Sequence, residues 1–243
     1  MKLLIGLGNP GAEHDRNRHN VGFMAADAIA DAHDFGPWRK KFQGQISEGR
    51  LGGEKCLLLK PTTYMNESGR AAAEAIRFYK LDLDDVIVLY DEIDLAAGKV
   101  RVKTGGGVAG HNGLKSLTRY IGNDYARVRI GIGHPGDKSK VHSHVLRDFS
   151  KAERVWLEPL IDVIASSAPL LAEGDTANFM NKVALATGGK EKSATSPKAK
   201  PNKAKGPSQR ELARNAASRE ADPETPAEGP FARLRKIFGA EGS

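Results

Sequence analysis

The sequence of 243 residues contains a single cysteine, Cys56, so no disulfide can form within the chain. Cys56 lies in the apolar run 56–59, which predicts a buried structural thiol rather than a nucleophile. No apolar stretch approaches the ~18 residues of a membrane span. The amino terminus also lacks the basic and then apolar segments of a secretion signal. These absences predict a cytoplasmic protein without stable membrane association.

An even distribution of charge is also absent. The formal net charge is +7, and residues 188–243 contain twelve Lys and Arg against seven Asp and Glu, a balance of +5. Residues 1–187 therefore have only +2, the difference between these two values. The tail is rich in Lys, Ala, Ser, Pro and Gly without hydrophobic periodicity, which is typical of a disordered basic extension. We predict one folded domain over 1–187 and a low-complexity tail over 188–243.

The end of this tail has a pattern of its own. Residues 231–238, FARLRKIF, place four apolar side chains on one helical face and three basic side chains elsewhere. Such a short amphipathic segment can dock on a partner, an anionic membrane surface or RNA. A simple solvated tail is the alternative that the low apolar content upstream favours.

The first twenty residues are the most informative part of the chain. An apolar run at 3–7 predicts a buried strand of a parallel sheet. It ends in the turn Gly-Asn-Pro-Gly at 8–11, which presents Asn9 at the carboxyl end of the strand. Ligands usually bind at that edge of an open α/β sheet. Four polar residues at 17–20, including His19, then precede an amphipathic segment at 21–33 that predicts a helix.

Two other interpretations of this stretch remain open. Gly6, Gly8 and Gly11 match the dinucleotide-binding pattern G-x-G-x-x-G. The context is poor, because Pro10 lies inside the turn and a polar segment at 13–20 stands where a helix should begin. His19 alone is equally compatible with a helix-terminal histidine that has no catalytic task.

Further strands and helices alternate along the rest of the domain, which predicts an α/β fold. Strands are predicted at 42–51 and 55–60 as an antiparallel hairpin, at 86–90 as the most apolar strand, and at 99–103 and 127–133 as alternating strands with basic residues on one side. Helices are predicted at 21–33, 68–80, 114–121, 150–172 and 175–185. We expect Pro159 to kink or divide the fourth of these helices.

Polar residues follow three of the predicted core strands. If those strands are parallel, Asn9, Asn66 and Asp91 gather at one edge of the sheet. An aspartate beside His19 can hold one imidazole tautomer and stabilise the imidazolium that forms when the histidine takes a proton. No serine or cysteine stands out as a nucleophile, so a histidine-activated water is the simplest scheme. Asparagine amides suit an acyl group and its developing oxyanion.

These residue types predict hydrolysis of an ester or activated acyl bond. Lys103, Arg127, Arg129 and Lys138 form a predicted cationic rim, which indicates that the acyl group is attached to a molecule with phosphates. A plain phosphate-ligand binding domain of the same fold class remains the alternative.

The other candidate ligand sites are weaker. The backbone N–H groups at the predicted helix start, 110–113, suit an anion. His142 and His144 are spaced to face the same side of a strand, but no third metal ligand lies nearby in the sequence. The sequence therefore predicts no metal site.

Six motifs in order along residues 1–187 carry a resemblance to a known family. They are GLGNPG at 6–11, RHNVG at 18–22, KPTTYMNESG at 60–69, DEIDL at 91–95, GHNGLKS at 110–116 and RVRIGIGHPG at 127–136. This set resembles bacterial-type peptidyl-tRNA hydrolase. The resemblance implies a single domain with a twisted mixed β-sheet flanked by helices. It also implies a monomeric esterase that releases peptide from the 3′ ribose of tRNA without metal or cofactor.

The same resemblance implies roles for individual residues. His19 is implied as the general base, Asp91 as the group that orients it, and Asn9 as a contact to the peptide backbone. The remaining implied contacts are Asn66 and Asn112 at the acyl end and 3′ terminus, Tyr64 and Met65 along the cleft, and Lys103, Arg129 and Lys138 at tRNA phosphates.

Two positions depart from the family pattern. His14 stands where the family commonly has a tyrosine that contacts the tRNA end, and an imidazole can still stack or donate there. Val108 and Ala109 stand in the glycine-rich loop where His-Gly is usual, which changes the polarity of that loop. The tail has no counterpart in the family's minimal form.

Two further hypotheses are a non-catalytic RNA binder, whose mark would be loss of His19 or Asp91, and a dinucleotide-dependent oxidoreductase.

Overall fold

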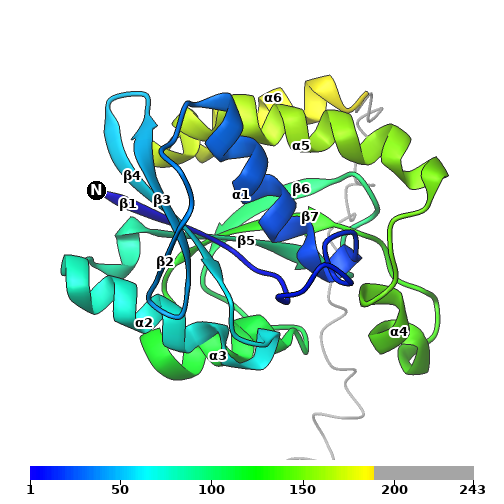
Figure 1. Cartoon of the computed structure of the whole chain (residues 1–243). Coiled ribbons are helices and arrows are strands. Elements are labelled where there is room, and N and C mark those ends of the chain that lie inside the picture. Colours follow the sequence, from blue (N-terminus) through cyan, green and yellow to red (C-terminus); the bar gives the residue numbers. More distant parts are fainter. Residues whose placement is uncertain (189–243) are drawn as a thin grey trace, which may run out of the picture. The chain divides into compact units, whose positions relative to one another are not determined.

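The computed structural model describes residues 1–188, which form a seven-stranded mixed sheet with helices on both faces (Figure 1). The strands are β1 Lys2–Gly6, β2 Arg39–Lys41, β3 Gly44–Leu51, β4 Glu54–Pro61, β5 Val86–Glu92, β6 Val100–Thr104 and β7 Ala126–Gly131. Their order is β2-β3-β4-β1-β5-β7-β6. Strands β4, β1, β5 and β7 are parallel, while β3 and β6 run against their neighbours. The predicted α/β fold with a mixed sheet is confirmed.

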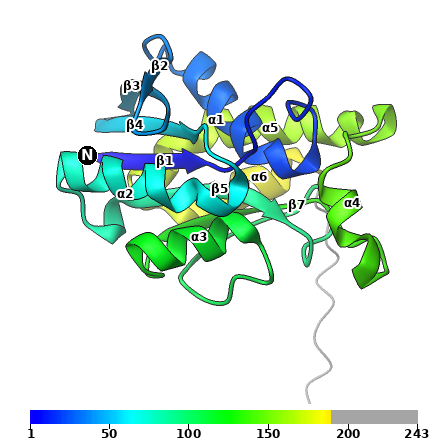
Figure 2. The same ribbon diagram turned by 60° about the horizontal axis from the view of Figure 1, so that its bottom comes forward.

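Residues 1–188 contain six α-helices. They are α1 Val21–Ala32, α2 Ser68–Tyr79, α3 Asn112–Ile121, α4 Val141–Val145, α5 Lys151–Ala172 and α6 Thr176–Ala186. Helices α1, α5 and α6 lie on one face, and α2 and α3 lie on the other (Figures 1 and 2). Short α4 lies beyond the carboxyl end of the parallel strands (Figure 2). The predicted helices are therefore present with small shifts at their ends.

The central strand β1 contributes to a hydrophobic core on each face. Leu4 packs with α1 and α5, whereas Leu3 and Ile5 pack with α2 and α3, and all three are fully buried. A strand covered on both faces needs no alternation of polar residues, which explains its continuous apolar run. The helices thus hold β1, and the polar turn that follows it, in a fixed position.

Glycines let α1 lie directly on the sheet. A Cβ at Gly6 would lie 2.4 Å from the carbonyl oxygen of Gly22, and a Cβ at Gly22 would lie 2.3 Å from that of Leu89. Gly6 therefore serves helix–strand packing. The chain then forms turns, and α1 begins only at Val21, so the glycine pattern lacks the immediate helix start of a dinucleotide fold. This close contact also brings the segment before α1 against the end of β5.

The predicted hairpin is present as β3 and β4, which pair antiparallel along their length. The sequence pattern missed β2. This strand contains only Arg39, Lys40 and Lys41, all of them exposed. A three-residue edge strand without an apolar side chain leaves no alternation to detect.

Helix α5 corrects the prediction that Pro159 divides this region, because the helix is continuous from Lys151 to Ala172. Pro159 is exposed, and Val155, whose carbonyl loses its helical partner, is 77% exposed. Water can therefore replace the missing hydrogen bond. The opposite side packs into the core through Leu160 and Ile164, both fully buried. Length and composition would also allow α5 to cross a membrane, but its buried side identifies it as a core helix.

Candidate active site

The polar residues that follow the parallel strands lie together at one edge of the sheet. Asn9 follows β1, and Asn66 lies in the short helix η2, Met65–Glu67, after β4. Asp91 is the second-last residue of β5, which pairs with β1 in parallel register. His19 lies in η1, Arg18–Asn20, immediately before α1. The topology brings Asn9, His19, Asn66 and Asp91 to a common site because β4, β1 and β5 are neighbours.

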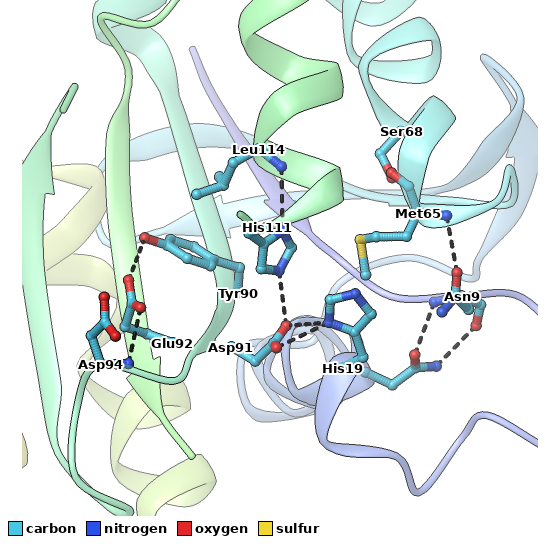
Figure 3. Close-up of polar contacts among 11 residues, drawn as sticks. Asn9, His19, Met65, Ser68, Tyr90, Asp91, Glu92, Asp94, His111 and Leu114 are labelled. Atoms are coloured by element: carbon cyan, nitrogen blue, oxygen red, sulfur yellow. Dashed lines mark hydrogen bonds and ion pairs between the residues drawn. The ribbon is translucent and has the colours of Figure 1, made fainter. Parts of the chain in front are cut away.

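Asp91 accepts hydrogen bonds from two histidines (Figure 3). His19 Nδ1 lies 2.8 Å from Asp91 Oδ1 and 2.9 Å from Oδ2. His111 Nε2 lies 2.9 Å from Oδ1. The backbone N–H of Leu114 donates to His111 Nδ1 at 3.3 Å, which leaves the proton of the neutral His111 ring on Nε2. Since the carboxylate only accepts, His19 carries its proton on Nδ1, and its Nε2 is left as an acceptor.

The electrostatics of this trio follow from burial and proximity. Burial by itself raises the pKa of Asp91, but the facing His19 and His111 outweigh it and hold that pKa well below its usual range. Burial lowers the pKa of His19, while the Asp91 carboxylate raises it, and the net result is a pKa above 6.5. His19 and Asp91 are 8% and 2% exposed. The pair therefore favours a negative carboxylate and an imidazole that readily takes a proton.

Asn9 is held by two neighbours. Its Oδ1 accepts from the backbone N–H of Met65 at 2.9 Å. Asn20 binds the Asn9 backbone twice, accepting from its N–H at 2.8 Å and donating to its carbonyl oxygen at 2.9 Å. The Asn9 Nδ2 group makes no hydrogen bond within residues 1–188 and remains available as a donor.

These groups face a cavity of about 900 Å³. Asn9, His19 and Asp91 line it together with residues of the η2 turn, the glycine-rich loop and α4. Of the residues expected at the cleft, it includes Tyr64, Met65, Asn66, Asn112 and Lys138. Met65 is buried, whereas Tyr64 is 73% exposed at the rim. The cavity thus joins buried acid–base groups to an open, partly apolar surface.

Three of the expected contact residues, His14, Lys103 and Arg129, lie outside this cavity. His14 Nδ1 accepts a hydrogen bond from the Asn17 amide at 3.1 Å. Lys103 lies on β6, half-buried and without an ion pair in the described part of the chain. Arg129 on β7 donates through Nε to Glu92 Oε2 at 3.0 Å, and Glu92 itself lines the cavity. Arg129 therefore lies behind the wall rather than in it.

Arg127 does not belong to a cationic rim, and this prediction is wrong. Its side chain is fully buried, and its guanidinium donates to the carbonyl oxygen of Gly107 at 3.0 Å and to the Asn123 side chain. Alternation along β7 correctly placed Arg127 and Arg129 on one face. It did not reveal that the glycine-rich loop covers the Arg127 end of that face. Arg127 thus supports the loop that carries His111 and Asn112.

His142 and His144 could have shared a metal only on a strand, but both residues lie in helix α4. Side chains two residues apart on a helix do not face each other. In the described part of the chain, the residues whose spacing could suit a metal ion are His19, Asp91 and His111. Their potential ligand atoms lie within 4.8 Å of one another. The facing atoms of this trio are already joined by N–H···O bonds, so a cation there would have to displace two protons.

Sequence reasoning missed the structural roles of His111 and Asn20, which contact Asp91 and Asn9. His111 caps α3 and binds Asp91 at the same time. Asn20 fixes the backbone of Asn9. The position of His111 directly before a predicted helix was a signal for capping, although not for the contact with Asp91. No local pattern indicates the contact between Asn20 and Asn9.

Comparisons with known proteins show the family of this chain. A family model described as peptidyl-tRNA hydrolase matches residues 3–194. The peptidyl-tRNA hydrolase of Mesorhizobium japonicum is 55% identical over 240 residues, covering 98% of this chain and 99% of the relative. That of a Methylobacterium species is 63% identical over 190 residues, covering 78% and 94%. The crystal structure of peptidyl-tRNA hydrolase from Acinetobacter baumannii is 38% identical, with a TM-score of 0.71 over 75% of this chain and 94% of that one. The chain belongs to the peptidyl-tRNA hydrolase family.

Proposed function

We propose that this protein hydrolyses the ester bond between a peptide and its tRNA, by means of a water molecule that His19 activates. The observation that carries the proposal is the His19–Asp91 contact of 2.8 Å at a cavity, in a chain of this family. The products are a free peptide and a reusable tRNA, so the reaction serves translation quality control and the rescue of ribosomes. We propose that the protein acts in the cytoplasm as a monomer and without a cofactor.

His19 Nε2 is the proposed general base. It takes a proton from water as the oxygen attacks the acyl carbonyl, and a bond forms between that oxygen and the carbonyl carbon. Asp91 stabilises the resulting imidazolium through Nδ1–H. When the tetrahedral intermediate collapses, the bond from the carbonyl carbon to the ribose oxygen breaks, and His19 returns the proton to that oxygen. His111 keeps the carboxylate in place through its own hydrogen bond.

The asparagines are the proposed neutral contacts to the acyl group. Asn9 can donate from Nδ2 toward the peptide backbone or the developing oxyanion, because Met65 holds its Oδ1. Asn66, in η2, and Asn112, at the start of α3, are exposed, and their amides can position the acyl end and the 3′ terminus. Tyr64 offers an exposed ring to the same ligand.

Cations outside the reacting centre are the proposed contacts to tRNA. Lys138 lines the cavity, and Lys103 and Arg129 lie beyond it on β6 and β7. His14, near the first turn, is proposed to contact the tRNA end. These side chains contribute a salt-dependent attraction to phosphates. The basic tail, which lies outside the described residues, is proposed to add a further RNA contact.

The direct test compares peptide release from an N-blocked peptidyl-tRNA by the wild-type chain and His19→Ala. We expect kcat to fall by about 10²–10⁴-fold, the usual effect of a lost general base, with tRNA binding largely kept. Near-normal turnover by His19→Ala would overturn the assignment of the base.

A matched control for this variant is His33→Ala, which removes the histidine that caps the carboxyl end of α1 and whose Nε2 contacts the carbonyl of Ala165. We expect this control to keep its turnover. Unblocked aminoacyl-tRNA should be cleaved slowly by the wild type, because it lacks the peptide group that Asn9 is proposed to contact. Equal cleavage of both substrates would contradict the role of Asn9.

A further inference from the structure

Arg18, the residue before His19, is buried and makes an ion pair across the molecule. Its Nη2 lies 2.6 Å from Glu153 Oε2 and 2.8 Å from Oε1, and its Nε lies 3.2 Å from Oε1. The Arg18 side chain is only 7% exposed. Glu153 is fixed in turn by Ser150, with which it forms the capping box at the start of α5. The guanidinium therefore has a rigid partner and little freedom to move.

The other side of the same guanidinium binds the end of α4. Its Nη1 donates to the carbonyl oxygens of His144, Arg147 and Asp148 at 3.3, 3.0 and 3.1 Å. The backbones also pair, because Arg18 N donates to Arg147 O at 3.1 Å. Carbonyl groups at a helix end lack intrahelical partners, and a cation there is favourable. Arg18 thus joins the segment that follows α4 to the segment that carries His19.

This junction matters because α4 is a wall of the cavity. Val141, His142, Val145 and Leu146 line it, as do Tyr64, Met65 and Asn66. A five-residue helix has too few hydrogen bonds to maintain its own position. The distance between this wall and the His19 ring is therefore set by contacts at the helix end, and Arg18 makes several of them one peptide away from His19.

We propose that Arg18, held by Glu153, is a positioning residue that fixes the α4 wall at the distance from His19 that the substrate requires. The inference rests on the proposed function, since it concerns the same cavity. Within residues 1–188, Arg18 makes no hydrogen bond or ion pair with Asp91 or with the His19 ring, so the proton chemistry does not depend on it directly. Loss of the ion pair should weaken substrate binding more than it slows the chemical step.

The test measures kcat and KM for peptidyl-tRNA with the full-length chain carrying Glu153→Gln. We expect KM to rise about tenfold and kcat to change less than threefold, because the amide loses the charge-assisted bidentate contact. Arg18→Lys should give the same result, since an ammonium group cannot bind the carboxylate and three carbonyls together. The midpoint of the pH–kcat profile should not move.

The matched control is Asp85→Asn, which removes a carboxylate from the Lys2–Asp85 pair of 2.8 Å. Asp85 precedes β5, at the end of the strand opposite to Asp91. Both carboxylate variants are assayed well below their melting temperatures. Asp85→Asn should keep the wild-type KM. The Lys2–Asp85 pair lies away from the cavity, so its loss should lower only the melting temperature.

An unchanged KM in folded Glu153→Gln, or a shifted pH midpoint, would overturn the positioning role. If Arg18→Lys does not fold, Glu153→Gln alone decides. A wild-type chain that releases no peptide would instead contradict the proposed function. The two failures are therefore distinguishable in the same set of assays.

Discussion

The two ends of the parallel strands differ in how far their charged side chains are buried. At the carboxyl end, Arg18, His19, Asp91 and Glu92 are all at most 8% exposed, and each has at least one charged or imidazole partner. At the amino end, the Lys2–Asp85 pair has side chains that are 23% and 28% exposed. These four residues at the carboxyl end are thus buried, whereas the Lys2–Asp85 pair at the amino end keeps partial contact with water.

This difference has an energetic meaning. A solvent-exposed ion pair contributes only about 0–1 kcal/mol to the free energy of unfolding. Buried charges lose their hydration, and their pairing often does no more than compensate for that loss. A network of buried charges is therefore poor evidence of selection for stability. Its position at the cavity therefore fits the proposed function better than a role in stability.

The largest expected effect comes from Asp91→Asn. The neutral amide cannot stabilise an imidazolium, and it can donate to His19 Nδ1 and so favour the wrong tautomer. We expect kcat to fall by on the order of 10²–10⁴-fold in a peptide-release assay. Loss of the carboxylate should also move the acidic midpoint of the pH profile to lower pH, because Asp91 raises the pKa of His19.

The corresponding change at the amino end, Asp85→Asn, should leave kcat unaltered. Equal losses of activity in the two variants would contradict the difference between the two ends. Such a result would mean that activity depends on general stability rather than on the buried His19–Asp91 pair.

A second prediction concerns the pH dependence of the wild type, which should be opposite for activity and stability. A base must be neutral, so kcat should rise with pH and level off above the raised pKa of His19, which exceeds 6.5. A raised pKa in the folded state gives stability that is present below about 6.5 and is lost as pH rises through the folded value. The lowered pKa of Asp91 gives stability that is present above 3.8 and lost in stronger acid.

These signs predict that the melting temperature declines slightly over the pH range in which kcat increases. Thermal unfolding and turnover measured between pH 5 and about 9 check this. His19→Ala should lack this part of the decline. The same decline in both proteins would show that other groups are responsible.

A third, smaller effect separates two cations that are cross-strand neighbours, Arg127 and Lys103. Arg127→Met leaves the Gly107 carbonyl and the Asn123 side chain without a partner, so we expect a loss of about 1–3 kcal/mol in the free energy of unfolding. Lys103→Gln should change stability by less than about 0.5 kcal/mol. It should instead reduce the slope of log K against log salt for tRNA binding by about one unit.

Denaturant unfolding and tRNA binding at several salt concentrations measure both quantities. A large stability loss in Lys103→Gln, or a weaker salt dependence without destabilisation in Arg127→Met, would reverse the assigned roles of these two residues.

The sequence was sufficient for most of the elements, though not for β2 or α4, and for the residues that we propose as the reacting pair, for local reasons. Continuous apolar runs identify strands covered on both faces, and the polar residue after each run marks the carboxyl edge. Asn9 and Asp91 could be found in this way. The same edge argument placed His19 near Asp91, although the two residues are 72 positions apart, and the motif resemblance then implied their roles.

The remaining contacts depend on tertiary structure that no local pattern reports. The Arg18–Glu153 pair spans 135 positions, and the burial of Arg127 depends on a loop of glycines folding over it. Pro159 was misjudged for a similar reason, because its effect depends on which side of α5 faces water. Short-range propensity is overruled where burial and water access decide.

The smallest expected effect concerns charge outside the sheet altogether. Residues 188–243 contribute +5 of the formal +7, whereas the buried groups that we assign to the chemistry lie within residues 1–187. Deletion of 188–243 should therefore leave kcat intact and flatten the salt dependence of tRNA binding, because fewer cations release counterions. A control tail with its twelve Lys and Arg replaced by Gln separates charge from length. An unchanged salt slope in both variants would assign the tail to something other than tRNA phosphates, while a fall in kcat would contradict the assignment of all the chemistry to the sheet edge.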